Sequence, residues 1–473
     1  MARFVLQLAV LSALLAGLSL LPGSEGWSGA ASRAERLASD HRLASALGSL
    51  AIVASHPGGE RWAAPRMGAL YLRRGQPAEA AAAFERAEAV GVGGPDLLLE
   101  DAEAARAMGD FEGSLERLRR LLRSGPLRTE VWARAVEAAA RLGLAPREIR
   151  DLAGGRRAAI GPPGEDQETA YLTTVCWLDP GAAESRALLA RAAEGSDGRV
   201  RRAASEMLAA SAEPEADARM LAEARLLLAQ GLVGPALARL DRVGSGSTAS
   251  LAEALALRGH ALTLLGRVGE AEEAARRSAQ ANPDHPLGSF VLGELLMARG
   301  DSAGAVAAFN RARRADPGNP AYLLMLADAL AAEGDYADAV RAVELAVKAE
   351  PESGDVRLAA ARFYVDHQYR IDLGLSDAQE AARLAPGSAE AQELLAWALH
   401  LSGRSAEALP AARTAVDLDP ESPLLRYRLG SIHEALGHRA EALEQFEMVK
   451  ELASDRQLLV RTEAALAELG RTQ

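Results

Sequence analysis

Hydrophobic and polar positions along the chain repeat in the pattern of paired amphipathic helices. Residues 287–298 carry apolar side chains at helical spacing and are followed by Gly300 and Asp301. Glycine accepts the left-handed backbone that follows a helix end, so the first helix is expected to stop there. A second helix is expected over 303–315, and Asp316-Pro317 ends it, because proline restricts the residue before it and lacks an N–H donor. The segment therefore predicts a helical hairpin.

The same punctuation recurs at a nearly fixed distance. Five prolines are separated by 34 or 35 residues: Pro283, Pro317, Pro351, Pro386 and Pro420. Glycines keep the same register, with Gln368 standing where one is missing: Gly231, Gly266, Gly300, Gly334, Gly403 and Gly437, and nearer the N-terminus Gly75, Gly109 and Gly143. A constant period in this range predicts a stacked array of hairpins.

Small residues also recur in the pattern. One repeat position holds only glycine or alanine, at 259, 293, 327, 361, 396 and 430. We expect two helix backbones to approach closely there, since a larger side chain would force them apart at a cost of about 1–3 kcal/mol. Phe84, Phe309 and Phe446 share a third position and are expected to fill the gap to the next hairpin.

These positions resemble the tetratricopeptide repeat, in which a small residue, tyrosine, alanine, phenylalanine and proline stand at fixed offsets. The fullest matches are Gly68-Tyr71-Ala80-Phe84-Ala87 and Gly293-Leu296-Ala305-Phe309-Ala312-Pro317. The resemblance implies an all-α, right-handed α-solenoid of stacked helix-turn-helix repeats with a C-terminal capping helix. Three features depart from the family: only Trp132 supplies the aromatic expected early in the first helix, Pro410 lies inside a predicted helix, and 367–374 holds one extra residue.

The predicted organisation has six parts. They are a signal peptide (1–26), an N-terminal helical segment (27–60), an N-terminal array (61–128), degenerate helical repeats (129–216), a C-terminal array (217–456) and a capping helix (457–473). In the last of these, Leu458, Thr462, Ala465, Leu466 and Leu469 share one face, as expected of a helix that covers a final apolar surface.

The N-terminus has the pattern of an export signal. Arg3 precedes an 18-residue apolar stretch from Phe4 to Leu21, and Pro22-Gly23 and small residues follow. Cleavage is expected after Gly26, with Ala30 as the alternative. The stretch is just short of the roughly 20 residues that span a bilayer, so retention of 4–21 as a membrane anchor is the competing interpretation. A bacterial exported protein, periplasmic, cell-envelope or extracellular, is the expectation.

Composition and charge narrow the function. The chain is 49% hydrophobic but only 4% aromatic, which favours helices over a β-sandwich. Its net charge of −12 argues against a nucleic-acid partner, because binding phosphate requires a basic face. The single cysteine, Cys176, cannot form an intrachain disulfide and is expected in a helix core.

No catalytic constellation is found in the sequence. It has no phosphate-binding glycine loop followed by Lys-Ser/Thr, no GxSxG, no HExxH and no CxxC. His400 and His433 lie about one repeat apart, but His433 takes the repeat's buried tyrosine position; His433 and His438 are five apart, which is poor helical spacing for joint ligation. We therefore predict no enzyme activity, no metal and no cofactor.

In this family the fifth, ninth and twelfth residues of each first helix face a concave groove. That correspondence nominates Phe290, Glu294, Leu324, Asp328, Leu358, Arg362, Glu393, Trp397, His400, Tyr427 and Glu434. Apolar or aromatic side chains with carboxylates beside them fit a protein or peptide with apolar anchors and basic flanks. The alternative is that these side chains pack between neighbouring first helices.

The predicted function is a non-catalytic scaffold or adaptor that binds a partner through this face. Two alternatives stay open: an assembly subunit of an envelope or secretion machine that acts by self-association, and an enzyme with a hidden site in 129–216.

Overall fold

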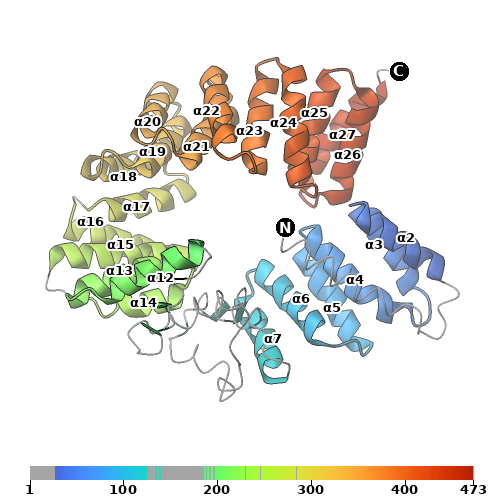
Figure 1. The fold of residues 1–473 in the computed structure, drawn as a ribbon, viewed down its shortest axis with the longest axis horizontal. Coiled ribbons are helices and arrows are strands. Elements are labelled where there is room, and N and C mark those ends of the chain that lie inside the picture. The colour runs from blue at the N-terminus through green and yellow to red at the C-terminus, as the bar shows by residue number, and fades with distance from the viewer. Residues whose placement is uncertain are drawn as a thin grey trace. The chain divides into compact units, whose positions relative to one another are not determined.

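The computed structural model describes residues 27–124 and 198–471, apart from Gln230, Ser245, Gly246 and Asp284, together with scattered positions between 131 and 194. These residues form 22 helices and no strand, which confirms the all-α prediction (Figure 1). The helices pair into hairpins that stack as a solenoid. The expected signal peptide, Trp132, Cys176 and most of 129–197 lie outside the described residues.

First and second helices alternate along the chain. The first helices are α2 (Ser28–Ser39), α4 (Gly59–Arg73), α6 (Pro95–Ala107), α13 (Ala216–Ala229), α15 (Thr248–Leu264), α17 (Pro286–Ala298), α19 (Pro320–Ala332), α21 (Gly354–Asp366), α23 (Ala389–Leu401) and α25 (Pro423–Ala435). The second helices are α3 (Leu43–Ala54), α5 (Pro77–Ala89), α7 (Phe111–Ser124), α14 (Val233–Leu240), α16 (Val268–Ala281), α18 (Ser302–Ala315), α20 (Tyr336–Ala349), α22 (Ile371–Leu384), α24 (Ser405–Leu418) and α26 (Arg439–Leu452). Two others are α12 (Gly198–Ser211) and the final α27 (Arg456–Arg471).

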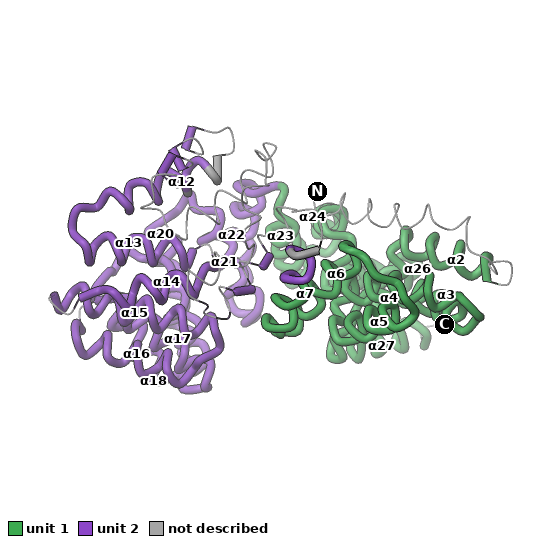
Figure 2. Tube along the Cα trace, turned by 90° about the horizontal axis from the view of Figure 1, so that it is seen from below, with its two compact units in different colours: residues 1–117, 387–473 green, residues 118–386 purple. Residues whose placement is uncertain are grey.

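The chain divides into two compact units, coloured separately in Figure 2. Unit 1 combines residues 1–117 with 387–473, and unit 2 comprises 118–386. Unit 1 is therefore assembled from the two ends of the chain. Each unit is described by itself below.

The periodic glycines end the first helices as the sequence predicts. Gly300 has a φ of 79°, and the N–H of Asp301 donates to the carbonyl of Leu296 at 2.9 Å. The Gly300 N–H donates to the carbonyl of Met297, so the two bonds satisfy carbonyls that the helix end leaves open. This Schellman turn sets the tight reversal of each hairpin.

The repeat that lacks the glycine keeps the same turn under strain. Gln368 has a φ of 48°, and the Tyr369 N–H still donates to the carbonyl of Tyr364. The extra residue of this turn is absorbed at Arg370, which is also left-handed with a φ of 51°. The expected distortion of 367–374 is thus confirmed, and its form is two non-glycine residues in a region that favours glycine.

In the repeats that carry a phenylalanine, the small residue of the first helix faces the phenylalanine ring and not a helix backbone, contrary to the expectation of a close backbone approach. A Cβ added at Gly293 would lie 2.5 Å from the ring of Phe309 in the partner helix of the same hairpin. Gly68 and Gly430 meet Phe84 and Phe446 in the same way, and all three rings are fully buried. Glycine there makes room for an aromatic ring, not for a backbone.

The direct backbone approach is found where the phenylalanine is missing. Ala275 stands one repeat before Phe309, and the small residue facing it is Gly259. A Cβ at Gly259 would lie 3.3 Å from the Ala271 carbonyl oxygen and 3.4 Å from the Ala275 nitrogen. One repeat position therefore serves two packing solutions.

Pro410 does not end its helix. Helix α24 continues from Ser405 to Leu418 with Pro410 inside it. Proline removes the hydrogen bond that residue 410 would donate to the preceding turn, and flanking Ala408, Ala411 and Ala412 are nevertheless buried against neighbouring helices. Tertiary packing thus outweighs the loss of one helical hydrogen bond.

The two parts of unit 1 meet through α3 and α26. Leu452 of α26 belongs to a buried cluster with Leu43 and Leu47 of α3. Glu451 accepts hydrogen bonds from the Ser45 N–H at 2.8 Å and the Ser45 hydroxyl at 2.5 Å. An apolar seam with charged groups at its edge therefore joins two segments that lie far apart in the sequence.

The last helix has the expected capping character. Leu458, Thr462 and Leu469 of α27 are buried, whereas Arg461 and Glu463 are exposed. No helix among the described residues combines the length and apolar character that crossing a membrane requires.

Candidate interaction surface

The eleven predicted site residues fall on five first helices. Six lie in unit 2, on α17, α19 and α21, and five lie in unit 1, on α23 and α25. Within unit 2, α19 contacts both α17 and α21; within unit 1, α23 contacts α25. Each unit therefore carries its own group of these residues on adjacent first helices.

Aromatic packing shapes the section in unit 2. Phe290 is half-buried, with its ring centroid 5.8 Å from that of Phe309 and 5.1 Å from that of Tyr322. Leu324 and Leu358 are also half-buried. Each of these three side chains is partly packed between helices and partly exposed. The predicted binding role and the alternative of packing between first helices are therefore compatible.

Carboxylates beside this stripe are desolvated. Burial raises the pKa of Glu294, and no ion pair joins its carboxylate to another described residue. Burial also raises the pKa of Asp328, against the lowering effect of His367, whose Nε2 lies 3.9 Å away, and of the exposed Arg362. Both carboxylates would gain from an added cation.

A compact polar and aromatic cluster forms the section in unit 1. Trp397 stacks on His400 with centroids 4.8 Å apart, and the guanidinium of Arg428 lies 4.9 Å from the centroid of Trp397. Arg428 pairs with Glu393 across the two first helices. The Trp397 ring is thereby held by a stacked imidazole and a cation.

Glu393 differs from its predicted role. It is 8% exposed and engaged by Arg428, so its carboxylate is part of the packing between α23 and α25. Breaking such a buried pair leaves an uncompensated charge, which makes Glu393 a positioning residue for Arg428 rather than an open ligand.

Tyr427 is covered by the last helix on one side. The guanidinium of Arg461 in α27 lies 4.9 Å from the Tyr427 ring centroid, and the ring of Phe446 lies 5.7 Å away on the other side. Burial raises the pKa of Glu434, and Glu468 adds to that effect. The surface of α25 therefore also carries a half-buried aromatic ring beside a desolvated carboxylate.

His433 and His438 lie close together, although their spacing of five residues suggested poor geometry for joint ligation. His433 is buried as predicted, and its Nδ1 lies 3.3 Å from Nδ1 of His438, because the chain reverses at Gly437 between them. His400 instead has its Nδ1 3.0 Å from the Ser405 hydroxyl. No group of three or more metal-ligating side chains occurs in the described part of the chain.

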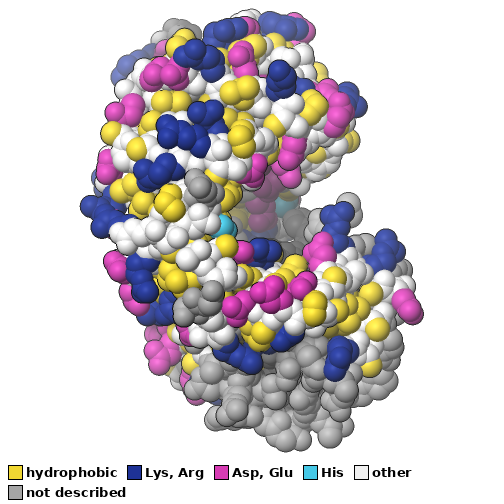
Figure 3. Space-filling model, turned by 90° about the vertical axis from the view of Figure 1, so that its left-hand side faces the viewer, with side chains coloured by type: hydrophobic (Ala, Val, Ile, Leu, Met, Phe, Trp, Pro, Cys, Tyr) yellow, Lys and Arg dark blue, Asp and Glu magenta, His cyan; other side chains and the backbone are white. Residues whose placement is uncertain are grey.

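Sequence reasoning missed Arg428 and Arg461. Both contact ring faces from helices neighbouring the ring, and neither stands at a groove position of the family pattern. On the face seen in Figure 3, arginines and carboxylates are interspersed around apolar side chains, with no separation into a basic and an acidic half.

The comparisons with known proteins agree with the repeat pattern. The tetratricopeptide-repeat family model matches residues 99–159, 257–320, 290–354, 324–370, 368–423 and 402–456, more than half of the chain. No curated protein matches the sequence.

Three solved structures illustrate the likeness. YrrB, described as a tetratricopeptide-repeat protein with an unusual peptide-binding site, is 21% identical over 41% of this chain and 99% of its own, with a TM-score of 0.33. A thermophilic repeat protein of Thermus thermophilus is 25% identical over 38% and 97%, with a TM-score of 0.33. Yeast Tom70 is 15% identical over 94% and 97%, with a TM-score of 0.36.

Proteins built from these repeats generally serve as protein-interaction scaffolds. With its 34-residue period, glycine-terminated first helices and matching segments over more than half its length, the chain belongs to the tetratricopeptide-repeat family.

Proposed function

We propose that this protein is a non-catalytic scaffold of the cell envelope or the extracellular space, which binds a protein or peptide through its first helices. The observation that carries the proposal is the Trp397 cluster. Arg428 and His400 hold a half-buried indole ring on the exposed side of α23. Trp and Arg are the residues most enriched among those that dominate binding energy at interfaces.

The character of the partner follows from the desolvated carboxylates on the first helices of each unit. Glu294 and Glu434 have raised pKa values because burial disfavours their ionised form. A cation placed beside them recovers part of that cost, so basic side chains flanking an apolar anchor are the complementary chemistry. We propose such a partner, and no nucleic acid.

The location rests on the N-terminal sequence alone. Arg3, the apolar stretch 4–21 and the small residues before Gly26 support export with cleavage after Gly26. N-terminal sequencing of the protein recovered from each cell fraction tests this. A mature chain beginning at Trp27 supports export, and an intact Met1 in the membrane fraction supports anchorage instead.

Site-specific photo-crosslinking in the cell tests the binding surface. A benzophenone residue at position 397 is expected to trap a partner, whereas the same residue at Glu407, exposed on the second helix α24, is not. Mass spectrometry then identifies the trapped species. Equal trapping at both positions, or at neither, contradicts a binding role for this face.

A double variant separates binding from folding. Trp397→Ala with Tyr427→Ala is expected to lose the trapped partner at least about tenfold, as for two interface anchors of about 1 kcal/mol or more each. Circular dichroism and the melting profile check that it stays folded, and Trp397→Phe with Tyr427→Phe serves as the conservative control. A folded double alanine variant that still binds as the wild type does overturns the assignment.

A further inference from the structure

One second helix stops early, and it leaves a cavity next to it. Helix α14 has 8 residues, whereas α16, α18, α20, α22, α24 and α26 have 14 each. Leu240, its last residue, stands at the repeat position of Phe309, so the turns that correspond to Asn310–Ala315 are missing. Ser247 caps the next first helix, α15, one turn earlier than usual.

The residues directly after α14 are tied to the neighbouring first helices α13 and α15. The Gly244 N–H donates to a carboxylate oxygen of Asp217 in α13 at 3.0 Å. Arg258 of α15 pairs with Asp241 at the end of α14. The Gly244–Asp217 hydrogen bond and the Arg258–Asp241 ion pair thus hold the chain in place directly after the end of α14.

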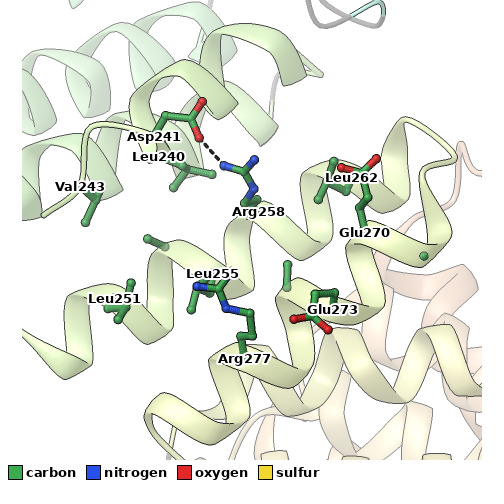
Figure 4. A pocket seen from close by; sticks show the side chains of 13 residues that line it. Leu240, Asp241, Val243, Leu251, Leu255, Arg258, Leu262, Glu270, Glu273 and Arg277 are labelled. Atoms are coloured by element: carbon green, nitrogen blue, oxygen red, sulfur yellow. Dashed lines mark hydrogen bonds and ion pairs between the residues drawn. The ribbon is translucent and has the colours of Figure 1, made fainter. Parts of the chain in front are cut away.

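A cavity of about 550 Å³ opens between the end of α14 and the α15–α16 hairpin (Figure 4). Its lining combines apolar side chains, among them Leu240, Val243, Leu251, Ala254, Leu255 and Leu262, with five charged ones, Asp241, Arg258, Glu270, Glu273 and Arg277. Arg258 also lines the cavity. It replaces a leucine of the repeat, since the residues one and two repeats later, Leu292 and Leu326, are buried leucines. Arg258 is half-buried in that place, and of the apolar residues around it only Val243 and Leu251 are half-buried, whereas Leu240, Ala254, Leu255 and Leu262 are buried.

This cavity is separate from the proposed binding face. The corresponding groove positions of α15 are Ala256, His260 and Thr263, and none of them lines it. It instead continues the interface by which a second helix packs on the next hairpin. In the later repeats that interface is covered by the last turn of a second helix, as where Ala346 of α20 shares a buried cluster with Val356 of α21.

Two charged side chains at the edge of the cavity indicate which kind of helix would fit over it. Glu273 and Arg277 lie one turn apart on the exposed side of α16, and no ion pair joins either to another described residue. Glu270, by contrast, is engaged by Arg267 through two hydrogen bonds of 2.8 and 2.6 Å. An opposing helix with a basic and an acidic side chain one turn apart complements the free pair.

We propose that this cavity is a docking site for a helical segment of a partner protein, which takes the place of the missing end of α14. The segment carries aliphatic side chains on its inner face and an acid–base pair that meets Arg277 and Glu273. It is a second contact surface, independent of the face that carries Trp397.

The chain's own α20 supplies a probe with this chemistry. A fluorescein-labelled peptide of residues 335–350 presents Val340 and Val343 on one side, with Glu344 and Lys348 one turn apart. Placed antiparallel to α16, its Glu344 faces Arg277 and its Lys348 faces Glu273. Fluorescence anisotropy with the full-length protein is expected to show saturable binding.

Filling the cavity tests the site without disturbing the core. A Cβ at Gly269, which lines the cavity, meets nothing within 4 Å, so Gly269→Trp is expected to fold and to weaken peptide binding about fivefold or more, about 1 kcal/mol. Gly48→Trp is the matched control, because Gly48 is also helical, exposed and open, and lies in unit 1. Equal binding by wild type and Gly269→Trp, or no saturable binding by the wild type, overturns the proposal.

Exchange of charges tests the orientation. Glu273→Lys with Arg277→Glu is expected to weaken binding of the peptide about fivefold, and a peptide with Glu344→Lys and Lys348→Glu is expected to recover it. A swap that has no effect on either peptide contradicts the assigned occupant. The Trp397→Ala, Tyr427→Ala variant should bind the peptide as the wild type does, so this test and that of the proposed function can fail separately.

A graft closes the cavity from within. Replacing residues 241–246 with the sequence ELAVKA of residues 344–349 restores the missing turns in the repeat register. The graft is expected to raise the melting temperature and abolish peptide binding. Sedimentation tests whether a second copy of the chain is the occupant instead, and the wild type is expected to show no self-association through the cavity. Self-association that Gly269→Trp removes and Gly48→Trp keeps would overturn the partner-helix assignment.

Discussion

Arg73 donates a hydrogen bond to Glu421, a residue 348 positions later in the sequence. His41 places its Nδ1 2.8 Å from the same carboxylate oxygen, and Arg74 donates to the backbone carbonyls of Lys450 and Ala453. These bonds surround the apolar seam between α3 and α26. The two ends of the chain are thus joined by a small charged network around a buried core.

Removal of the Glu421 charge is expected to loosen this junction. Burial acts to raise the pKa of Glu421, but hydrogen bonding and charge attraction from Arg73, and then from His41, outweigh it and leave the pKa below its usual range. Glu421→Gln should cost about 1.5–3 kcal/mol, the contribution of a hydrogen bond to a charged group. Faster hydrogen–deuterium exchange in 43–54 and 439–452 is the measurement, with the exposed Glu352→Gln as the control.

The same carboxylate sets a pH dependence of the junction. Its pKa is lower when folded than when unfolded, so its contribution is fully present above the unfolded value of about 4.3 and is lost as the pH falls through the folded value. Wild-type exchange in 43–54 should therefore accelerate on acidification, after correction for intrinsic rates. An equally steep acceleration in Glu421→Gln would assign the effect to other groups.

The two packing solutions at the small-residue position predict different mutational behaviour. Gly293→Ala forces a methyl group against the Phe309 ring and is expected to destabilise unit 2 by about 1–3 kcal/mol in urea unfolding. Phe309→Leu should rescue it in part, since a leucine leaves space near that Cβ. The matched Gly259→Ala has no ring to yield and backbone atoms at 3.3 and 3.4 Å, so Ala275→Gly should give no comparable rescue.

Gln368 offers a stabilising substitution. A left-handed conformation costs a non-glycine residue about 1 kcal/mol, so Gln368→Gly is expected to raise the stability of unit 2 by about that amount. Gly334→Gln, the reverse change in the preceding repeat, should lower it similarly. Paired melting curves compare the two, and a loss of stability in Gln368→Gly would mean that the Gln368 side chain contributes more than its backbone costs.

The half-buried carboxylate of Glu294 is expected to lower the stability of the folded protein. Its pKa is raised by burial, so its ionisation opposes folding as the pH rises through the folded value. Glu294→Gln should therefore raise the melting temperature by about 1–2 °C at pH 8, which corresponds to about 0.5 kcal/mol for domains of roughly 150–250 residues, and by less at pH 4. Glu407→Gln, a change at a fully exposed carboxylate paired with Arg404, is the control.

The hairpins were predictable because their signals are local. Gly300, Pro317 and the apolar spacing between them act within one repeat, and repetition multiplies a weak signal. The face of each first helix followed from the same register, which placed Trp397 and Tyr427 on half-buried positions.

The remaining features depend on pairings that no local pattern encodes. Nothing near Arg73 in the sequence indicates Glu421, and Arg428 reaches Trp397 only because α25 packs beside α23. The early stop of α14 did have a signal, since the Gly-Ser-Gly-Ser stretch 244–247 falls where a second helix should continue. Glycine and serine disfavour helix continuation, and that stretch was readable as a missing turn.

The composition of unit 1 from both chain ends has a consequence for the order of folding. Domains generally fold as they emerge from the ribosome, N-terminal parts first. Helices α2–α6 can pair with their sequence neighbours early, but Leu452 joins their core only after α26 has been synthesised. Until then this core lacks the part that Leu452 supplies, so a chain that stops before α26 leaves that side of α3 open.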